Sequence, residues 1–208
     1  MSNRGRVILS LFLALAGRPV FAQGPAVLVH LYDDAGLKPK AFRDLASRTQ
    51  AILVHAGLSV QVVACPKEGL PCQGVEGNPH ELMVRVMGGE AGSMKNVLHP
   101  PLGQSVTDAG GGTYASVFLP QVRLVANDVG VPWITVLSYA VVHEIGHLLL
   151  GSDSHTPEGV MKANWKANDL LAMDQSRLYF DRQQARQLAS RFGPGRHSEA
   201  GETLLARQ

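Results

Sequence analysis

The chain has 208 residues, of which 45% are hydrophobic and 17% are charged. This composition is typical of one globular domain with a hydrophobic core, and it excludes a largely disordered chain. The formal net charge is only +2 and the sequence has no basic stripe, so we expect no nucleic-acid partner.

The first 22 residues have the pattern of a signal peptide. A short basic start precedes an uncharged apolar run from Val7 to Ala16, and small residues at Val20 and Ala22 predict cleavage after Ala22. A membrane anchor is the alternative, but a spanning helix needs about 20 apolar residues and Arg18 interrupts this run too early. We therefore predict a secreted or periplasmic protein that has no membrane attachment once the signal peptide is removed.

Removing residues 1–22 also changes the charge of the chain. That segment holds three of the 19 basic residues and none of the 17 acidic ones, so the mature protein carries a formal net charge of −1. We expect residues 23–194 to form one domain and residues 195–208 to form a flexible polar tail. We expect the mature protein to be a monomer.

Hydrophobic periodicity predicts strands and one helix in the first part of the mature chain. The predicted elements are a strand over 26–32, a helix over 39–55, and strands over 58–64 and 81–87. Apolar residues recur in the helix at steps of three and four, whereas the strands are β-branched or alternate in polarity. Residues 88–112 are rich in Gly, Pro, Asn and Ser, which predicts a long loop.

The second part of the chain is predicted to be mainly helical. We expect a short strand over 114–119, a short helix around 120–127, a long helix over 132–150, and a last helix over 181–192 capped by Asp181. The order of all these elements predicts an α+β fold, in which two or three helices pack against a small, twisted mixed sheet.

Cys65 and Cys72 are the two cysteines of the chain, and they enclose the short segment PKEGLP. In an exported protein, an even number of cysteines at close spacing predicts a disulfide. Zinc binding is the alternative, but no further cysteine completes a set of four ligands. The spacing also differs from the CxxC pair of redox enzymes.

The long predicted helix contains the sequence HEIGH. His143 and His147 are four residues apart, so they lie on one face of the helix, one turn apart, and both imidazoles can reach one metal ion. Glu144 lies about 100° around the helix, where it can contact a water on the metal. This HExxH pattern is the signature of zinc peptidases. Because the helix is apolar on nearly every side, these polar groups would cost several kcal/mol if they were buried without partners.

A catalytic zinc ion usually takes three protein ligands and leaves one position for water. His155 follows His147 by eight residues and comes after Gly151, which allows the helix to stop and the chain to fold back towards the metal. We therefore predict one zinc ion held by His143, His147 and His155.

The segment HEIGHLLLGSDSHTPEGVM resembles the zinc-binding region of the metzincins, whose pattern is HExxHxxGxxH followed by a Met-turn. Gly151 and His155 fall one and two residues later than in that pattern. The distance from His143 to Met161, and the PEGVM segment, are similar to those of matrixins. If Met161 fixes the alignment, Asp153 takes the third-ligand position instead of His155.

This resemblance implies a zinc metalloendopeptidase whose metal helix forms the floor of a cleft, with Met161 packed beneath the metal. Zinc lowers the pKa of a bound water, and Glu144 acts as the general base while that water attacks a peptide carbonyl. We expect a peptide or protein substrate to pair as an added strand with an exposed sheet edge, for which 114–119 is the candidate.

A function of a different class is an exported protein that binds zinc without cleaving anything. Glu144 argues against it, because a structural site has no use for a base beside the metal, and structural zinc sites are usually closed by four protein ligands.

Overall fold

The computed structural model describes residues 24–65, 72, 79–89 and 101–195. Within these residues the chain forms one five-stranded sheet with the strand order β2-β1-β3-β5-β4. The strands are β1 (Val27–Asp33), β2 (Val60–Cys65), β3 (His80–Met87), β4 (Gly103–Asp108) and β5 (Gly111–Phe118). Strands β2, β1, β3 and β5 run parallel to one another, whereas β4 runs antiparallel to β5 at one end of the sheet. This mixed sheet with its packing helices confirms the predicted fold class.

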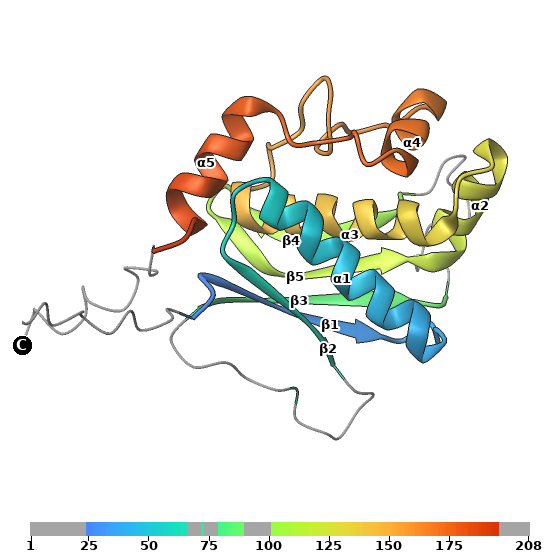
Figure 1. Cartoon of the computed structure of the whole chain (residues 1–208), viewed down its shortest axis with the longest axis horizontal. Coiled ribbons are helices and arrows are strands. Elements are labelled where there is room, and N and C mark those ends of the chain that lie inside the picture. The colour runs from blue at the N-terminus through green and yellow to red at the C-terminus, as the bar shows by residue number, and fades with distance from the viewer. Residues whose placement is uncertain (1–23, 66–71, 73–78, 90–100, 196–208) are drawn as a thin grey trace, which may run out of the picture.

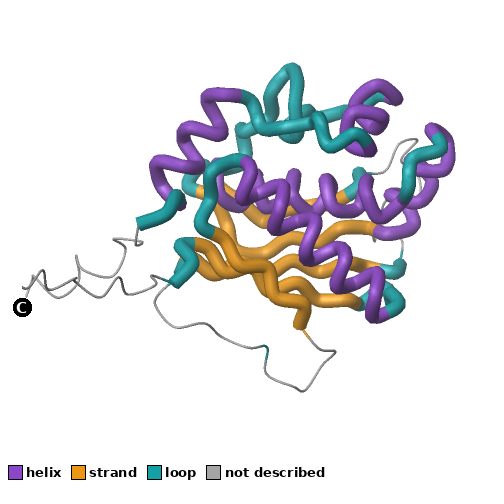
Figure 2. The backbone as a smooth tube through the Cα atoms, in the orientation of Figure 1, coloured by secondary structure: helices purple, strands orange, loops and turns teal. Residues whose placement is uncertain are grey.

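The parallel strands require crossover connections, and helix α1 (Pro39–His55) provides the one between β1 and β2. Helix α3 (Trp133–Leu150) follows α2 (Leu119–Val129), and α4 (Ala167–Asp174) and α5 (Arg182–Phe192) complete the described helices. Figure 1 shows α1 and α3 across one face of the sheet, with α4 and α5 beyond α3 on the side away from the sheet. Figure 2 shows that loops connect α3 to α4 and α4 to α5 in this outer layer.

Helix α3 is the central helix of the molecule, and 14 of its 18 residues are buried. By length and composition it could cross a membrane, but 78% of it is buried inside the fold, which is the pattern of a core helix. It packs on β4 and β5 from one side and contacts α1, α2 and α4. The position of α3 between the sheet and the outer layer explains why its sequence is apolar all round.

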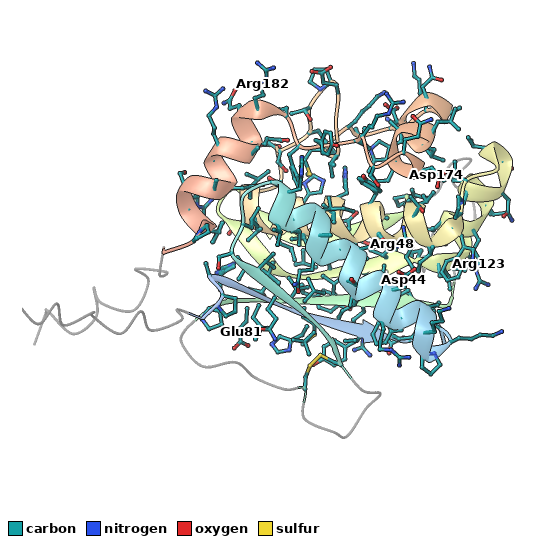
Figure 3. All side chains as sticks on the ribbon, in the orientation of Figure 1. Asp44, Arg48, Glu81, Arg123, Asp174 and Arg182 are labelled. Atoms are coloured by element: carbon teal, nitrogen blue, oxygen red, sulfur yellow. A yellow bond between two sulfur atoms is a disulfide. The ribbon has the colours of Figure 1, made fainter. Side chains whose placement is uncertain are left out.

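Several predicted elements are confirmed with small shifts at their ends. The helix over 39–55 has the predicted bounds, and the short helix around 120–127 extends to Leu119–Val129. Asp181 caps α5 as predicted, because its side chain accepts hydrogen bonds from the backbone N–H groups of Gln183 and Gln184. The predicted disulfide joins Cys65 to Cys72, at the end of β2, and is drawn in yellow in Figure 3.

Three predictions about the second half of the chain are wrong. Residues 103–108, expected in a long loop, form β4, because pairing with β5 outweighs their polar, glycine-containing composition. The strand over 114–119 is no sheet edge, since β5 is paired with β3 on one side and β4 on the other. The described chain has five helices, of which four were predicted, and α4 was missed.

Other predictions fall on residues that the structure does not describe. The signal peptide over 1–22 lies outside the described residues, as does the tail over 195–208 except for Gly195. The first part of the loop predicted over 88–112 also lies outside them, from 90 to 100.

Candidate metal centre

The three histidines predicted as ligands lie together in the structure. His143 and His147 are one turn apart on α3, and their Nε2 atoms are 3.1 Å apart. The Nε2 atom of His155 is 3.1 Å from that of His147, so three imidazole nitrogens converge on one point. Asp153, the alternative third ligand, is exposed and does not belong to this cluster.

Gly151 allows the chain to bring His155 back to the helix. Its φ is +97°, a conformation that favours glycine, and a side chain there would meet the backbone oxygen of Ala109 at 2.7 Å. The next residue, Ser152, donates its backbone N–H to the oxygen of Asp108 at 3.1 Å, which ties the turn to the end of β4. The end of α3 is therefore fixed against the sheet, and the turn that follows it brings His155 back next to His147.

The remaining nitrogens of the two helical histidines contact fixed oxygen atoms. His143 Nδ1 lies 2.8 Å from the backbone oxygen of Val160, which can only accept a hydrogen bond, so the proton is on Nδ1 and the Nε2 lone pair is free. His147 Nδ1 lies 2.9 Å from Ser154 Oγ, and that hydroxyl in turn donates to the oxygen of Gly151. These contacts direct the Nε2 atoms of both rings towards the point of convergence.

The donor set fits one zinc ion. Zinc–nitrogen bonds of about 2.0–2.1 Å at tetrahedral angles separate two ligand nitrogens by about 3.3 Å, close to the observed 3.1 Å. Burial lowers the pKa of His143 to about 4 and also lowers the pKa of His147. Both rings are therefore neutral at pH 7, which is the form that binds a metal ion.

Glu144 lies beside this cluster and is almost completely buried, with 6% of its surface exposed. Burial raises the pKa of its carboxyl from 4.5 to about 7, and a hydrogen bond from the Ser105 hydroxyl to Oε2 partly opposes this rise. A Cβ added to Gly103 would lie 2.5 Å from Glu144 Oε1, so the glycine leaves room for the carboxylate. A carboxyl group with a pKa near neutral can both accept and release a proton.

The histidines and Glu144 line an open cleft of about 580 Å³. One wall is the inner face of β4, from Gly103 to Thr107, and α3 contributes the floor as predicted. The segment 162–165 forms part of the lining, and the Trp165 ring stands edge-on to that of His143 with centroids 5.4 Å apart. Neither Ser105, Gly103 nor Trp165 was predicted, because the region around each shows no local motif.

Met161 packs against the helix beneath the histidines. It is fully buried, and a Cβ added at Gly146, between Glu144 and His147, would collide with its sulfur atom and lie 3.3 Å from the ring of Phe180. Met161 was predicted to lie beneath the metal as a packing element, and the structure shows its contact with Gly146 of α3.

Comparisons with known proteins found structures of similar fold but no related sequence. No protein-family model and no curated protein sequence matches this chain. Among solved structures, the zinc-dependent peptidase from Methanocorpusculum labreanum (strain Z) matches with a TM-score of 0.50 and 19% identity, over 77% of this chain and 99% of that chain. Archaemetzincin from Methanopyrus kandleri matches with a TM-score of 0.49 and 16% identity, over 81% of this chain and 96% of that chain. The chain therefore shares its overall fold with the zinc-dependent peptidase from Methanocorpusculum labreanum.

Proposed function

We propose that this protein is a zinc-dependent endopeptidase of the metzincin type. The observation that carries the proposal is the convergence of three imidazole nitrogens beside a buried glutamate in one open cleft. Three ligands leave a position for water, which is the arrangement of a catalytic zinc site, whereas structural sites are usually closed by four ligands. Met161 beneath the metal helix supports the metzincin resemblance, and so does the fold shared with a zinc-dependent peptidase.

The chain's own residues suit peptide hydrolysis. A zinc ion bound by His143, His147 and His155 would supply a Lewis acid and a water of lowered pKa. Glu144 lines the same cleft beside the histidines, where it would accept a proton from the attacking water and pass it to the leaving amine. The histidines hold their Nε2 atoms in place through the Nδ1 contacts, so little rearrangement is needed.

The substrate is proposed to lie along β4. This strand lines the cleft and has a neighbour on one side only among the described residues. Its free edge offers backbone N–H and C=O groups to an extended peptide, which would pair with it as a further strand. β4 replaces the strand over 114–119 in this role.

Cleavage of unfolded casein by the purified mature protein tests the proposal. Glu144→Gln keeps the shape of the side chain but removes the base, so we expect the rate to fall about 10²- to 10⁴-fold while the zinc content stays unchanged. Zinc analysis of His155→Ala and Asp153→Ala identifies the third ligand, and we expect only the first variant to lose metal. Equal cleavage rates for the unmodified protein and Glu144→Gln would rule out catalysis and leave a zinc-binding protein as the function.

We also propose that the protein is exported and that residues 1–22 are removed. The disulfide between Cys65 and Cys72 supports export, because such bonds persist in oxidising compartments. N-terminal sequencing of protein secreted or released from the periplasm should begin at Gln23. Recovery of the full-length chain in the cytoplasm would contradict this proposal.

A further inference from the structure

Two residues of β4 hold the carboxylate of Glu144 from the side opposite the helix. The Ser105 hydroxyl donates to Glu144 Oε2 and also lies 3.2 Å from the backbone oxygen of Glu144. Gly103, two residues earlier on the same face of the strand, lies against Oε1. Since Glu144 is 6% exposed, these contacts restrict a side chain that has little other freedom.

The same two residues present their backbone groups to the open edge of the sheet. The oxygen of Leu102 accepts a hydrogen bond from the N–H of Phe118 on β5 at 2.8 Å. Alternation in an antiparallel pair then directs the backbone groups of Gln104 to β5, and those of Gly103 and Ser105 to the opposite side. The register is regular over this stretch, because its shift comes only after Val106.

We propose that Ser105 and Gly103 are positioning residues for Glu144, an inference that rests on the proposed peptidase function. The Ser105 hydroxyl fixes Oε2, and the missing side chain of Gly103 leaves Oε1 room beside the cleft to exchange protons with water. A peptide paired with the free backbone groups of Ser105 would bind to the residue that orients the base. β4 therefore aligns the substrate and the general base with one another.

Three substitutions probe these contacts. Ser105→Ala removes the donor, and Ser105→Thr restores a hydroxyl at the same place. Gly103→Ala places a methyl group 2.5 Å from Oε1 and 2.7 Å from Cγ of Glu144, so the buried carboxylate has to shift from its present position.

Matched controls repeat the same chemical changes elsewhere. Ser190→Ala removes an exposed hydroxyl on α5 whose only hydrogen bond within the described part of the chain is to the backbone oxygen of Gln187. Gly89→Ala adds a methyl group at an exposed glycine that has open space around it and an ordinary φ.

We expect Ser105→Ala and Gly103→Ala to lower kcat about tenfold or more, with KM and zinc content nearly unchanged, because the base is present but misdirected. Ser105→Thr should recover most of the lost kcat, and both controls should cleave like the unmodified protein. If Ser105 had a purely structural role, its replacement would not lower kcat while leaving KM nearly unchanged.

A second measurement uses the metal-free protein and does not depend on activity. Ser105→Ala should lower the urea midpoint when Glu144 is present and should lower it less in a Glu144→Ala background, because the two side chains interact. Unchanged kcat in Ser105→Ala and Gly103→Ala, or equal midpoint shifts in both backgrounds, would overturn the positioning role alone. No cleavage by the unmodified protein would overturn the proposed function and the positioning role together.

Discussion

Glu144 shows how a single residue can work against the stability of its own fold. It belongs to the apolar helix α3, and burial of its carboxyl raises the pKa to about 7. At higher pH the native state must keep a charged group away from water, with the Ser105 hydroxyl as the one side-chain donor recorded for it in the described chain. The group needed for proton transfer is therefore also a local source of instability.

This conflict predicts how Glu144→Gln affects the metal-free protein. The pKa of about 7 in the folded state lies above the unfolded value of 4.5, so folding favours the protonated form. The cost of the charge is fully present above pH 7, falls as the pH drops through 7, and disappears below 4.5. We expect Glu144→Gln to be more stable than the unmodified protein by on the order of 2–3 kcal/mol at pH 8, and nearly equal to it at pH 4.

Urea denaturation at both pH values measures this difference in unfolding free energy. Glu158→Gln makes the same change at an exposed carboxyl and should have little effect at either pH. A Glu144→Gln protein that is less stable than the unmodified one at pH 8 would contradict the prediction.

At the scale of elements, helix α5 supports the metal centre without contributing a ligand. Gln184, which is buried on α5, donates from Nε2 to the backbone oxygen of Ser154 at 2.7 Å. The Ser154 hydroxyl lies next to Nδ1 of His147, so α5 holds the turn that orients this histidine. Such outer contacts typically change metal affinity by 10- to 100-fold.

We therefore expect Gln184→Leu to weaken zinc binding about tenfold while the protein stays folded. The substitution keeps a side chain of similar volume, and it also removes the buried Gln184 Oε1, which has no hydrogen-bond partner among the described residues. Competition with a chromophoric chelator measures the dissociation constant. Gln183→Leu, at the exposed neighbouring position, is the matched control, and equal zinc affinities of the two variants would show that α5 has no such role.

At the scale of the whole molecule, the sequence predicts what depends on local pattern. Helix α1 and the histidines of α3 follow from periodicity and spacing, and Gly151 marks the turn that returns His155. The strand β4 could not be predicted in this way, because it is a polar, half-exposed edge strand that exists through pairing with β5. The roles of Ser105 and Gly103 depend on that pairing, so they could not be predicted from the sequence either.

The choice between His155 and Asp153 shows a further limit of local pattern. Spacing alone left both open, because His155 falls two residues later than the third histidine of the metzincin pattern, whereas an alignment fixed by Met161 puts Asp153 at that position. In the structure the turn at Gly151 leaves the imidazole inside the cluster and the carboxylate exposed. The conformation of the turn shows which of the two residues joins the histidine cluster, whereas sequence alignment does not.

The packing of Met161 against Gly146 also limits how this centre can change during evolution. The sulfur occupies the space that any larger residue at 146 would need, and the polypeptide backbone of α3 cannot retreat because it is packed against the sheet on its other side. The two positions therefore form one steric unit. A homologue with a bulkier residue at the glycine position would have to carry a smaller one in place of the methionine, so the two sites should mutate as a pair.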